Sequence, residues 1–199
     1  LYMVTGGLGG VGKMLLQMLL EKSESRFIVL GRRSYESVRE SLFSDRISYV
    51  QIDITNQDHM ETLFGHLRKQ GEIRGVFHLA ALLHDEEIAS LSSSDFDAVL
   101  GAKCQGAFLL DQCTAESPLD FFICFSSLAS VFGNIGQAAY AAADGFLDGW
   151  AAFREERVRR GMRKGRTLSV GWPYLRGGLH SSGISRVGEM SEAVFREMM

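Results

Sequence analysis

Residues 5–12 read Thr5-Gly6-Gly7-Leu8-Gly9-Gly10-Val11-Gly12, and this glycine-rich stretch decides the expected fold. It follows a β-type run at residues 1–4 and precedes a helical pattern at residues 11–22. Within it, Gly7, Gly9 and Gly12 match the pattern G-x-G-x-x-G. Glycines at these places let the chain turn tightly after a strand and approach a pyrophosphate that rests on the N-terminus of the next helix. Because the strand and the helix are both present, the stretch predicts a dinucleotide-binding turn.

The same stretch also fits a second type of phosphate-binding loop. Gly7, Gly12 and Lys13 match the pattern G-x-x-x-x-G-K of P-loop nucleotide hydrolases. That motif continues with a Ser or Thr whose hydroxyl holds Mg²⁺, whereas this chain continues with Met14. The missing hydroxyl disfavours nucleotide hydrolysis.

Strand-like and helical patterns alternate along the whole chain. We expect strands at residues 1–4, 27–31, 47–52, 76–79, 119–125 and 167–171, and helices at 11–22, 35–43, 56–70, 93–116 and 137–160. This alternation predicts a doubly wound α/β fold, in which right-handed crossovers connect the strands of a parallel sheet (a Rossmann fold). Residues 173–199 are loop-like with a short helical pattern at 187–199, which indicates a lid segment over the site or a loosely packed tail.

Composition and charge disfavour several other classes of protein. The 199 residues are 46% hydrophobic and 23% charged, which is typical of one globular domain with a buried core. A net charge of −3 gives no electrostatic reason to bind nucleic acid or an acidic membrane surface. No apolar run approaches the ~18–20 residues of a membrane span, so we expect no membrane association. The chain begins inside a predicted strand, which indicates a segment of a larger polypeptide.

The cysteines and histidines show no pattern of disulfide or metal chemistry. No cysteine belongs to a C-x-x-C pair and each lies in an apolar stretch, which favours buried free thiols in a reducing, cytoplasmic compartment. No histidines have the spacing of paired metal ligands, so we expect no metal site. His78, at a strand end, is interpreted as a packed residue rather than a catalytic base. The residues concerned are Cys104, Cys113, Cys124, His59, His66, His78, His84 and His180.

The residues after the second predicted strand indicate which nicotinamide cofactor is bound. An NAD enzyme places an Asp or Glu about twenty residues beyond the glycines, where it binds the ribose hydroxyls. This chain has Arg32 and Arg33 after Gly31. Guanidinium groups bind phosphate oxygens in pairs, so they suit the 2′-phosphate of NADPH. A solvated basic turn is the alternative interpretation.

Three polar residues are candidates for the reacting groups. Ser127 follows the predicted strand at 119–125, at the end of the sheet where ligands bind, and Tyr140 follows thirteen positions later. A hydroxyl near a phenol could polarise a carbonyl while the phenol donates a proton. Lys103 lies on the apolar stripe of the predicted helix at 93–116, where burial is costly unless its charge is needed. Near a phenol its charge would lower the tyrosine pKa, although a lysine that reaches the surface is the alternative. That stripe consists of Phe96, Val99, Leu100, Ala107 and Leu110.

Over essentially its whole length, the chain resembles the catalytic half of a ketoreductase domain from a modular polyketide synthase, within the short-chain dehydrogenase/reductase superfamily. The family's TGGLGGLG turn is similar to TGGLGGVG at 5–12, and its lysine lies in a stretch similar to GAKCQGA at 101–107. Its serine lies in FSS, as at 125–127, and its tyrosine in GQAxYAAAN, which residues 136–143 match. The sequence TLSVGWP at 167–173 resembles the family's segment before the lid.

The resemblance implies reduction by NADPH of a β-ketoacyl chain carried on the phosphopantetheine arm of an acyl carrier protein, with the other domains of the same synthase as partners. Tyr140 would donate the proton, Ser127 would hold the carbonyl oxygen and Lys103 would tune the phenol. Residues 1–199 would form a single catalytic domain, without its preceding structural half-domain and without its own last strand. The implied cofactor site consists of Thr5, Gly7, Leu8, Gly9, Gly10, Val11, Gly12, Arg32, Arg33, Asp53, Ile54, Ala80, Lys103 and Tyr140.

The fourth catalytic position departs from the family pattern. Asp144 stands where the family has Asn, four positions after Tyr140. A carboxylate ~5 Å from the phenol would oppose phenolate formation by roughly 3 kcal/mol at an effective dielectric near 20. Pairing of Asp144 with Lys103 would reduce that effect or divert the lysine from the tyrosine. We expect activity with a shifted pH profile, and the alternative is a redox-silent ketoreductase-like domain that binds NADPH without turnover.

Two further positions bear on the substrate and the product. Leu83-His84-Asp85 stands where one ketoreductase subtype has Leu-Asp-Asp, and Phe132 stands where the other has Trp, eight positions before the tyrosine. Asp85 and the absence of that Trp favour the D-hydroxyacyl product, while His84 weakens the match. We expect Asp85, Phe132 and Gln137 to control substrate orientation. A sugar-nucleotide epimerase is disfavoured, because its tyrosine is followed four residues later by Lys.

Overall fold

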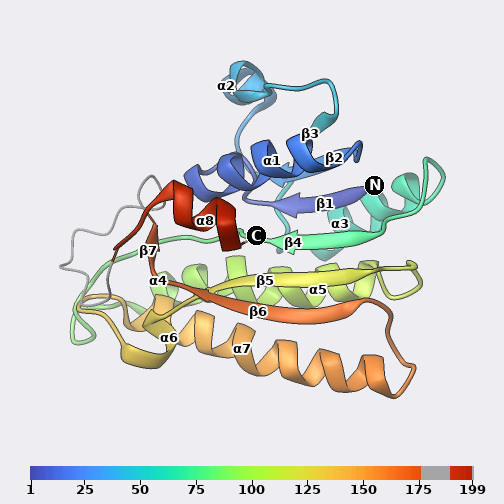
Figure 1. The fold of residues 1–199 in the computed structure, drawn as a ribbon. Coiled ribbons are helices and arrows are strands. Elements are labelled where there is room, and N and C mark those ends of the chain that lie inside the picture. The colour runs from blue at the N-terminus through green and yellow to red at the C-terminus, as the bar shows by residue number, and fades with distance from the viewer. Residues whose placement is uncertain (176–188, 199) are drawn as a thin grey trace.

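The computed structural model describes residues 1–175 and 189–198, which form a parallel sheet covered by helices on both faces (Figure 1). The six strands lie in the order β3-β2-β1-β4-β5-β6, and every neighbouring pair is parallel. This arrangement confirms the predicted doubly wound α/β fold. The strands are β1 (Tyr2–Thr5), β2 (Phe27–Gly31), β3 (Ile47–Gln51), β4 (Gly75–His78), β5 (Phe121–Ser127) and β6 (Arg166–Trp172).

The helices divide into two layers because successive strand residues point to opposite faces of the sheet. Met3 and Phe122 belong to a core with the helices α3, α5 and α7, whereas Val4 and Phe125 belong to a core with α1, α2 and α8. The helices are α1 (Gly10–Lys22), α2 (Tyr35–Val38), α3 (Gln57–Leu67), α4 (Ser93–Leu100), α5 (Gly106–Cys113), α6 (Ala129–Phe132), α7 (Ala138–Arg159) and α8 (Glu192–Met198), with a 3₁₀ turn η1 (Arg39–Ser41) after α2.

The helix expected at residues 93–116 is interrupted and shorter than predicted. Between α4 and α5 the chain forms a π-helical turn, η2 (Gly101–Gln105), in which Lys103 lies. The backbone N–H of Gly106 donates to the carbonyl of Gly101, five residues earlier, as in a π-helix. The helical hydrogen bonds stop at Thr114, whose hydroxyl donates to Leu110 O over 2.6 Å. Such turns within α-helices are frequent at functional sites.

The expected lid segment lies only partly within the described residues. Two short strands, β7 (Tyr174–Leu175) and β8 (Glu189–Met190), pair in parallel, and α8 follows them. Phe195 of α8 is buried against Trp172, with ring centroids 4.9 Å apart. Gly177, Gly178 and Gly183 of the predicted loop lie outside the described residues. The described end of the segment is therefore packed on the sheet beside α1.

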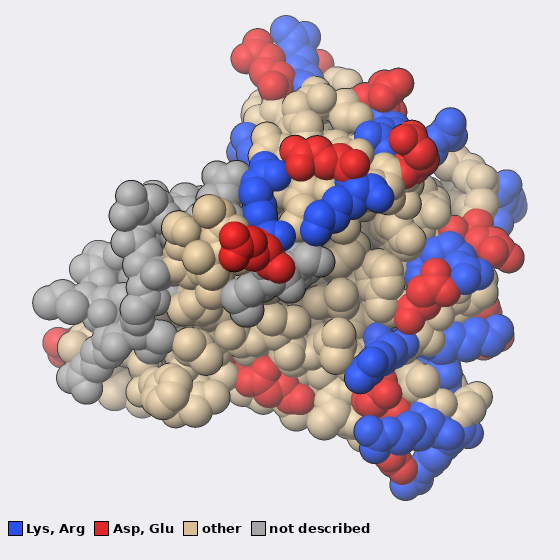
Figure 2. All heavy atoms as spheres, in the orientation of Figure 1, with Lys and Arg blue, Asp and Glu red and all other residues tan. Residues whose placement is uncertain are grey.

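Charged side chains of both signs are mixed over the visible face of the molecule (Figure 2). Uncharged surface predominates at the lower left of this view, over α6 and the start of α7. None of the described helices is both long and apolar enough to cross a lipid bilayer. Among the described cysteines, Cys113 and Cys124 are buried free thiols and Cys104 is a half-buried one.

Candidate active site

The glycine-rich turn connects β1 to α1 at the carboxyl end of the sheet. Gly6 has φ = 69°, and a Cβ atom there would lie 2.7 Å from Leu79 O on the neighbouring loop. A Cβ atom on Gly12 would lie 2.5 Å from Gly6 O, so this turn closes only with glycine at these positions. Gly9 precedes α1 and no side chain caps the helix, which leaves its first N–H groups available to an anion.

One cavity of about 790 Å³ runs along this edge of the sheet and brings together most of the residues singled out in the sequence. It extends from the glycine-rich turn past the ends of β2, β4 and β5 to the start of α7. A cavity of this size at the carboxyl ends of parallel strands is the usual ligand site of such folds. Among its lining residues are Gly7, Leu8, Gly9, Gly10, Val11, Gly12, Arg32, Arg33, Asp53, Ile54, Ala80, Lys103, Ser127, Gln137 and Tyr140.

Four candidates lie outside that lining within the described part of the chain: Thr5, Asp85, Phe132 and Asp144. Thr5 and Asp144 are completely buried. Phe132 is 68% exposed on α6. Asp85 lies in the loop after β4, where Oδ1 accepts a hydrogen bond from Gln137 Nε2 over 3.1 Å. These residues would therefore act on the site through the residues they contact, or would contact a ligand that extends beyond the cavity.

The arginine pair lies at the end of β2, on one side of the cavity. Arg33 Nη2 donates to Leu8 O of the glycine-rich turn over 3.3 Å, and Tyr49 Oη donates to Arg33 O over 2.7 Å. Asp53 accepts hydrogen bonds from both the N–H and the hydroxyl of Thr55. Burial by itself raises the pKa of Asp53, but the Thr55 hydrogen bonds lower it below its usual value. The cavity wall therefore offers two guanidinium groups beside a fixed carboxylate.

Lys103 is the buried cation of the site, with 2% of its surface exposed. Nζ donates to Phe125 O over 2.9 Å and lies 2.5 Å from Asp144 Oδ1. It also lies 4.8 Å from the centre of the Tyr140 ring. Burial alone lowers the pKa of this ammonium, but Tyr140 and Asp144 together raise it above its usual value. Lys103 is therefore charged and shared between the phenol and the carboxylate.

Asp144 is buried on the same face of α7 as Tyr140, and its partners there are Lys103, 2.5 Å away, and the Ser127 hydroxyl. Burial raises the pKa of Asp144 above its usual value, and Lys103 only partly offsets this. Burial also raises the pKa of Tyr140, Lys103 lowers it, and Asp144 raises it again. The carboxylate and the ammonium thus act on the phenol in opposite directions.

Ser127 is the last residue of β5, and a backbone N–H group orients its side chain. Its Oγ accepts a hydrogen bond from Ala129 N over 3.0 Å. A hydroxyl that accepts from a backbone N–H keeps its own hydrogen for a further acceptor. Ser127 lines the cavity, and its hydroxyl hydrogen can go either to the Asp144 carboxylate, whose pKa it lowers, or to an acceptor bound in the cavity.

Gln137, directly before α7, connects the loop after β4 to the segment that begins at Asn134. Its Nε2 donates to Asp85, and its Oε1 accepts from Asn134 Nδ2 over 2.9 Å. The backbone N–H of Glu86 donates to Gly136 O over 2.8 Å, which ties the loop after β4 to the same segment. These bonds fix the start of the helix that carries Tyr140.

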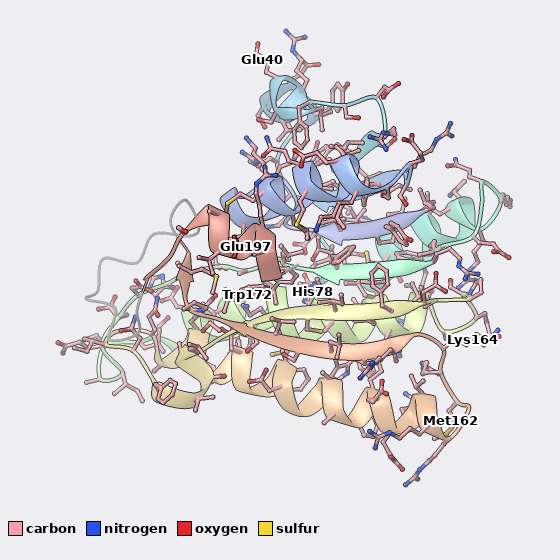
Figure 3. The ribbon with its side chains drawn as sticks, viewed as in Figure 1. Glu40, His78, Met162, Lys164, Trp172 and Glu197 are labelled. Atoms are coloured by element: carbon pink, nitrogen blue, oxygen red, sulfur yellow. The ribbon has the colours of Figure 1, made fainter. Side chains whose placement is uncertain are left out.

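His78 is a site residue that the sequence did not single out as functional. It ends β4 in the interior of the molecule (Figure 3), with 1% of its surface exposed. Its Nδ1 lies 2.8 Å from Thr5 Oγ1 and its Nε2 lies 2.9 Å from Lys103 O. Burial lowers the pKa of His78 to about 4. The positions of Thr5 and His78 at the ends of two strands that prove adjacent were the available signal.

The parallel sheet and the glycine-rich turn give the chain the fold of the short-chain dehydrogenases/reductases. A solved short-chain dehydrogenase from Streptomyces avermitilis, 16% identical, has the same fold, with a TM-score of 0.78 over 96% of this chain and 70% of that one. Within this class the chain belongs to the KR domain family, whose sequence model matches residues 1–177.

Relatives and solved structures of polyketide synthases are similar to this chain. Polyketide synthase ThaG of Burkholderia thailandensis is 37% identical over 86% of this chain, and polyketide synthase PksN of Bacillus subtilis is 36% identical over 89%. The chain spans 3% of the length of each. A crystal structure of a ketoreductase domain from the bacillaene assembly line is 32% identical, with a TM-score of 0.84 over 91% of this chain and 46% of that one.

Proposed function

We propose that the chain reduces the β-keto group of a polyketide intermediate to a hydroxyl, with NADPH as the reductant. The observation that carries this proposal is the single cavity that Tyr140, Ser127 and Lys103 share with the glycine-rich turn. Membership of the KR domain family supports the same reaction. The substrate is proposed to arrive on the phosphopantetheine arm of an acyl carrier protein, and residues 1–199 to act as one catalytic domain among others of a larger synthase.

The residues present fit NADPH. A Cβ atom on Gly12 would occupy the space where the turn closes, and the uncapped start of α1 leaves N–H groups available to a pyrophosphate. Arg32 and Arg33 line the cavity beside this turn, where their guanidinium groups suit a 2′-phosphate. The bound cofactor would supply the hydride for the ketone carbon.

The proton is proposed to come from Tyr140. As the ketone oxygen gains negative charge, the phenol donates a proton to it and Ser127 donates a hydrogen bond. The Lys103 ammonium, 4.8 Å from the ring centre, favours the phenolate that remains. Asp144 weakens this effect, because it neutralises part of the lysine charge at 2.5 Å. Turnover with an unusual pH dependence is the consequence.

We also propose that the D-hydroxyacyl product is formed. Asp85 is held by Gln137, next to the helix that carries the tyrosine, which supports a role in orienting the substrate. Position 132 carries a phenylalanine that is 68% exposed on α6, in place of the tryptophan of the other subtype. Chiral chromatography of the hydroxyacyl product tests this assignment, and predominance of the L-product would overturn it.

A redox-silent domain is the second candidate function, and one specific observation favours it. Lys103 Nζ lies 2.5 Å from Asp144 Oδ1, so the carboxylate takes up part of the charge that also lowers the pKa of Tyr140. A lysine held by the carboxylate would leave the phenol without its activating charge, so NADPH would bind without turnover. The two candidates differ in turnover and agree in cofactor binding.

Oxidation of NADPH, followed by its absorbance in the presence of a small β-ketoacyl thioester, tests the proposed function. We expect turnover that Tyr140→Phe abolishes, and faster turnover when the same acyl chain is attached to an acyl carrier protein. NADH should react more slowly than NADPH, and Arg33→Ala should narrow that difference, while Arg166→Ala at the exposed start of β6 serves as the matched control. Tight NADPH binding without turnover would establish the redox-silent candidate instead.

A further inference from the structure

We propose that His78 is a positioning residue, which holds the backbone of the π-helical turn so that the Lys103 ammonium stays beside Tyr140. The inference rests on the proposed function, since Lys103 is its proposed activating lysine. It extends that function to two buried residues, His78 and Thr5, neither of which itself lines the cavity. Within the described part of the chain, the His78 ring hydrogen-bonds to one residue that lines the cavity, Lys103.

The hydrogen bonds determine which nitrogen of His78 carries the proton. Lys103 O is a carbonyl and can only accept, so His78 Nε2, 2.9 Å away, must donate. His78 is neutral near pH 7, because burial lowers its pKa to about 4, and Nδ1 is then an acceptor. Thr5 Oγ1 accepts from Ala80 N over 3.1 Å, which leaves its hydrogen to donate to Nδ1 over 2.8 Å. Every group in this chain of hydrogen bonds has one consistent role.

The π-helical turn gives Lys103 O an irregular set of donors. In a regular α-helix each carbonyl accepts from the N–H four residues later. Around η2 this pattern fails, and Gly106 N–H is shared between Gly101 O and Lys103 O. The His78 ring supplies a second donor to Lys103 O from the neighbouring strand. The irregular turn is therefore held from the sheet and not by the helix alone.

Gly106 shows that the turn lies directly against the His78 ring. A Cβ atom at position 106 would lie 3.1 Å from His78 Cε1 and 2.6 Å from Ile54 Cδ1. Only a residue without a side chain lets the helix approach the histidine this closely. The contact and the hydrogen bond thus fix the backbone of Lys103, while Phe125 O fixes the far end of its side chain.

A displacement of Lys103 is expected to affect catalysis more than cofactor binding. Misplacing a catalytic group by about 1 Å can cost about 10²-fold in rate. The glycines at 6–12 and the arginines belong to other elements than His78 and Lys103, so the KM for NADPH should change little in the His78 variants. A residue with a merely structural role would instead change stability and leave the ratio of kcat to KM of the folded protein unaltered.

Four variants of the full chain test the proposal. Glutamine at position 78 carries a donor near the place of Nε2, whereas asparagine is too short to reach Lys103 O. We expect His78→Asn to lower kcat by about 10²-fold with little change in the KM for NADPH, and His78→Gln to recover most of the loss. Thr5→Val removes the donor to Nδ1 and should lower kcat, whereas Thr5→Ser retains the hydroxyl. His66→Asn is the matched control, because His66 is exposed and bonds only to Thr62 O of its own helix.

A measurement without turnover separates this proposal from the proposed function. In ¹H–¹⁵N spectra the buried Lys103 ammonium should give a slowly exchanging signal, assigned by its absence in Lys103→Met. We expect His78→Asn and Thr5→Val to shift or remove this signal, and His78→Gln to retain it. An unchanged Lys103 signal in folded His78→Asn and Thr5→Val would overturn the proposal. If the unsubstituted chain shows no turnover, only the proposed function is overturned. The Lys103 ammonium signal would still report the position of this side chain.

Discussion

Two buried acid–base pairs lie at opposite ends of the sheet, and they differ in how many hydrogen bonds hold their charged groups. Arg154 of α7 is 1% exposed and donates to Asp111, Thr167, Gly165 O and Lys164 O. Lys103 and Asp144 are equally buried, but apart from their mutual contact at 2.5 Å, Lys103 Nζ donates within the described residues to a single backbone carbonyl, Phe125 O. In Figure 3, Met162 and Lys164 mark the end of the molecule near the arginine pair, and Trp172 marks the end near the lysine pair.

The difference separates a pair that stabilises the fold from a pair that changes the pKa of a neighbouring phenol. A fully hydrogen-bonded buried pair is rigid and strongly destabilising to break. Asp111 also accepts from Arg163, so the arginine pair connects α5, α7 and the loop before β6. The lysine pair retains acceptor capacity beside the cavity and shares its charge with Tyr140. Among the described residues, the two pairs thus differ in the hydrogen bonds that hold the cation outside the pair itself, with three acceptors for Arg154 against one backbone carbonyl for Lys103.

The largest effect is expected when the arginine pair is broken. Asp111→Ala leaves the buried Arg154 guanidinium without its carboxylate and should cost about 3–5 kcal/mol of stability. Urea unfolding measures this change. Glu156→Ala, which removes an exposed partner of Arg160, is the control and should cost no more than about 1 kcal/mol. Equal effects of the two substitutions would show that the buried pair does not hold the fold.

Breaking the lysine pair should affect rate rather than stability. Lys103→Met removes the charge that favours the phenolate, so kcat should fall about 10²-fold. The loss of stability should be smaller than for Asp111→Ala, because Asp144, whose pKa burial already raises, can take up a proton. Steady-state kinetics and urea unfolding of the same variant measure both. A destabilisation as large as that of Asp111→Ala would remove the contrast between the pairs.

The lysine pair is supported by a histidine that acid should disrupt. Burial lowers the pKa of His78 to about 4, from 6.5 in the unfolded chain, so the unfolded state binds more protons between these values. The His78 contribution to stability is complete above pH 6.5 and is lost as the pH falls towards 4. This difference amounts to about 3 kcal/mol. Unfolding of the unsubstituted chain and of His78→Gln at several pH values isolates it, and parallel curves would contradict it.

The smallest effect is expected from neutralising the acid of the lysine pair. The Asp144 charge raises the pKa of Tyr140, so Asp144→Asn should lower that pKa. Because the protonated phenol is the donor, the alkaline limb of the rate profile should move to lower pH while turnover is retained. Initial rates from pH 6 to about 10 measure the limb. Asp144→Glu, which keeps the charge, is the matched control, and an identical limb in Asp144→Asn would exclude a role for the charge.

Much of the site was predictable because its signals are local in the sequence. The spacing of Gly7, Gly9 and Gly12 identified the turn, and the place of Lys103 on an apolar stripe identified a buried cation. Asp144 was singled out by the resemblance, because it stands where the family has Asn, and the structure pairs it with Lys103.

The remainder depends on contacts between distant residues. Asp111 and Arg154 are 43 positions apart, and no periodic pattern links them. The His78 bonds to Thr5 and Lys103 depend on the strand order and on an irregular turn inside a helix that reads as continuous. The helix α6 was also missed, because four residues give too short a pattern to recognise.

The π-helical turn also sets the rotation of everything that follows it. Each residue turns an α-helix by about 100°, so one extra residue changes the angular phase of α5 relative to α4 by that amount. Val99 before the turn packs against α7, and Leu110 after it packs against the sheet. Deleting a single residue from Gly101–Gln105 would rotate Leu110 away from the sheet, whereas most substitutions there would not. For the packing of α5 on the sheet, the number of residues in the turn therefore matters more than their identity.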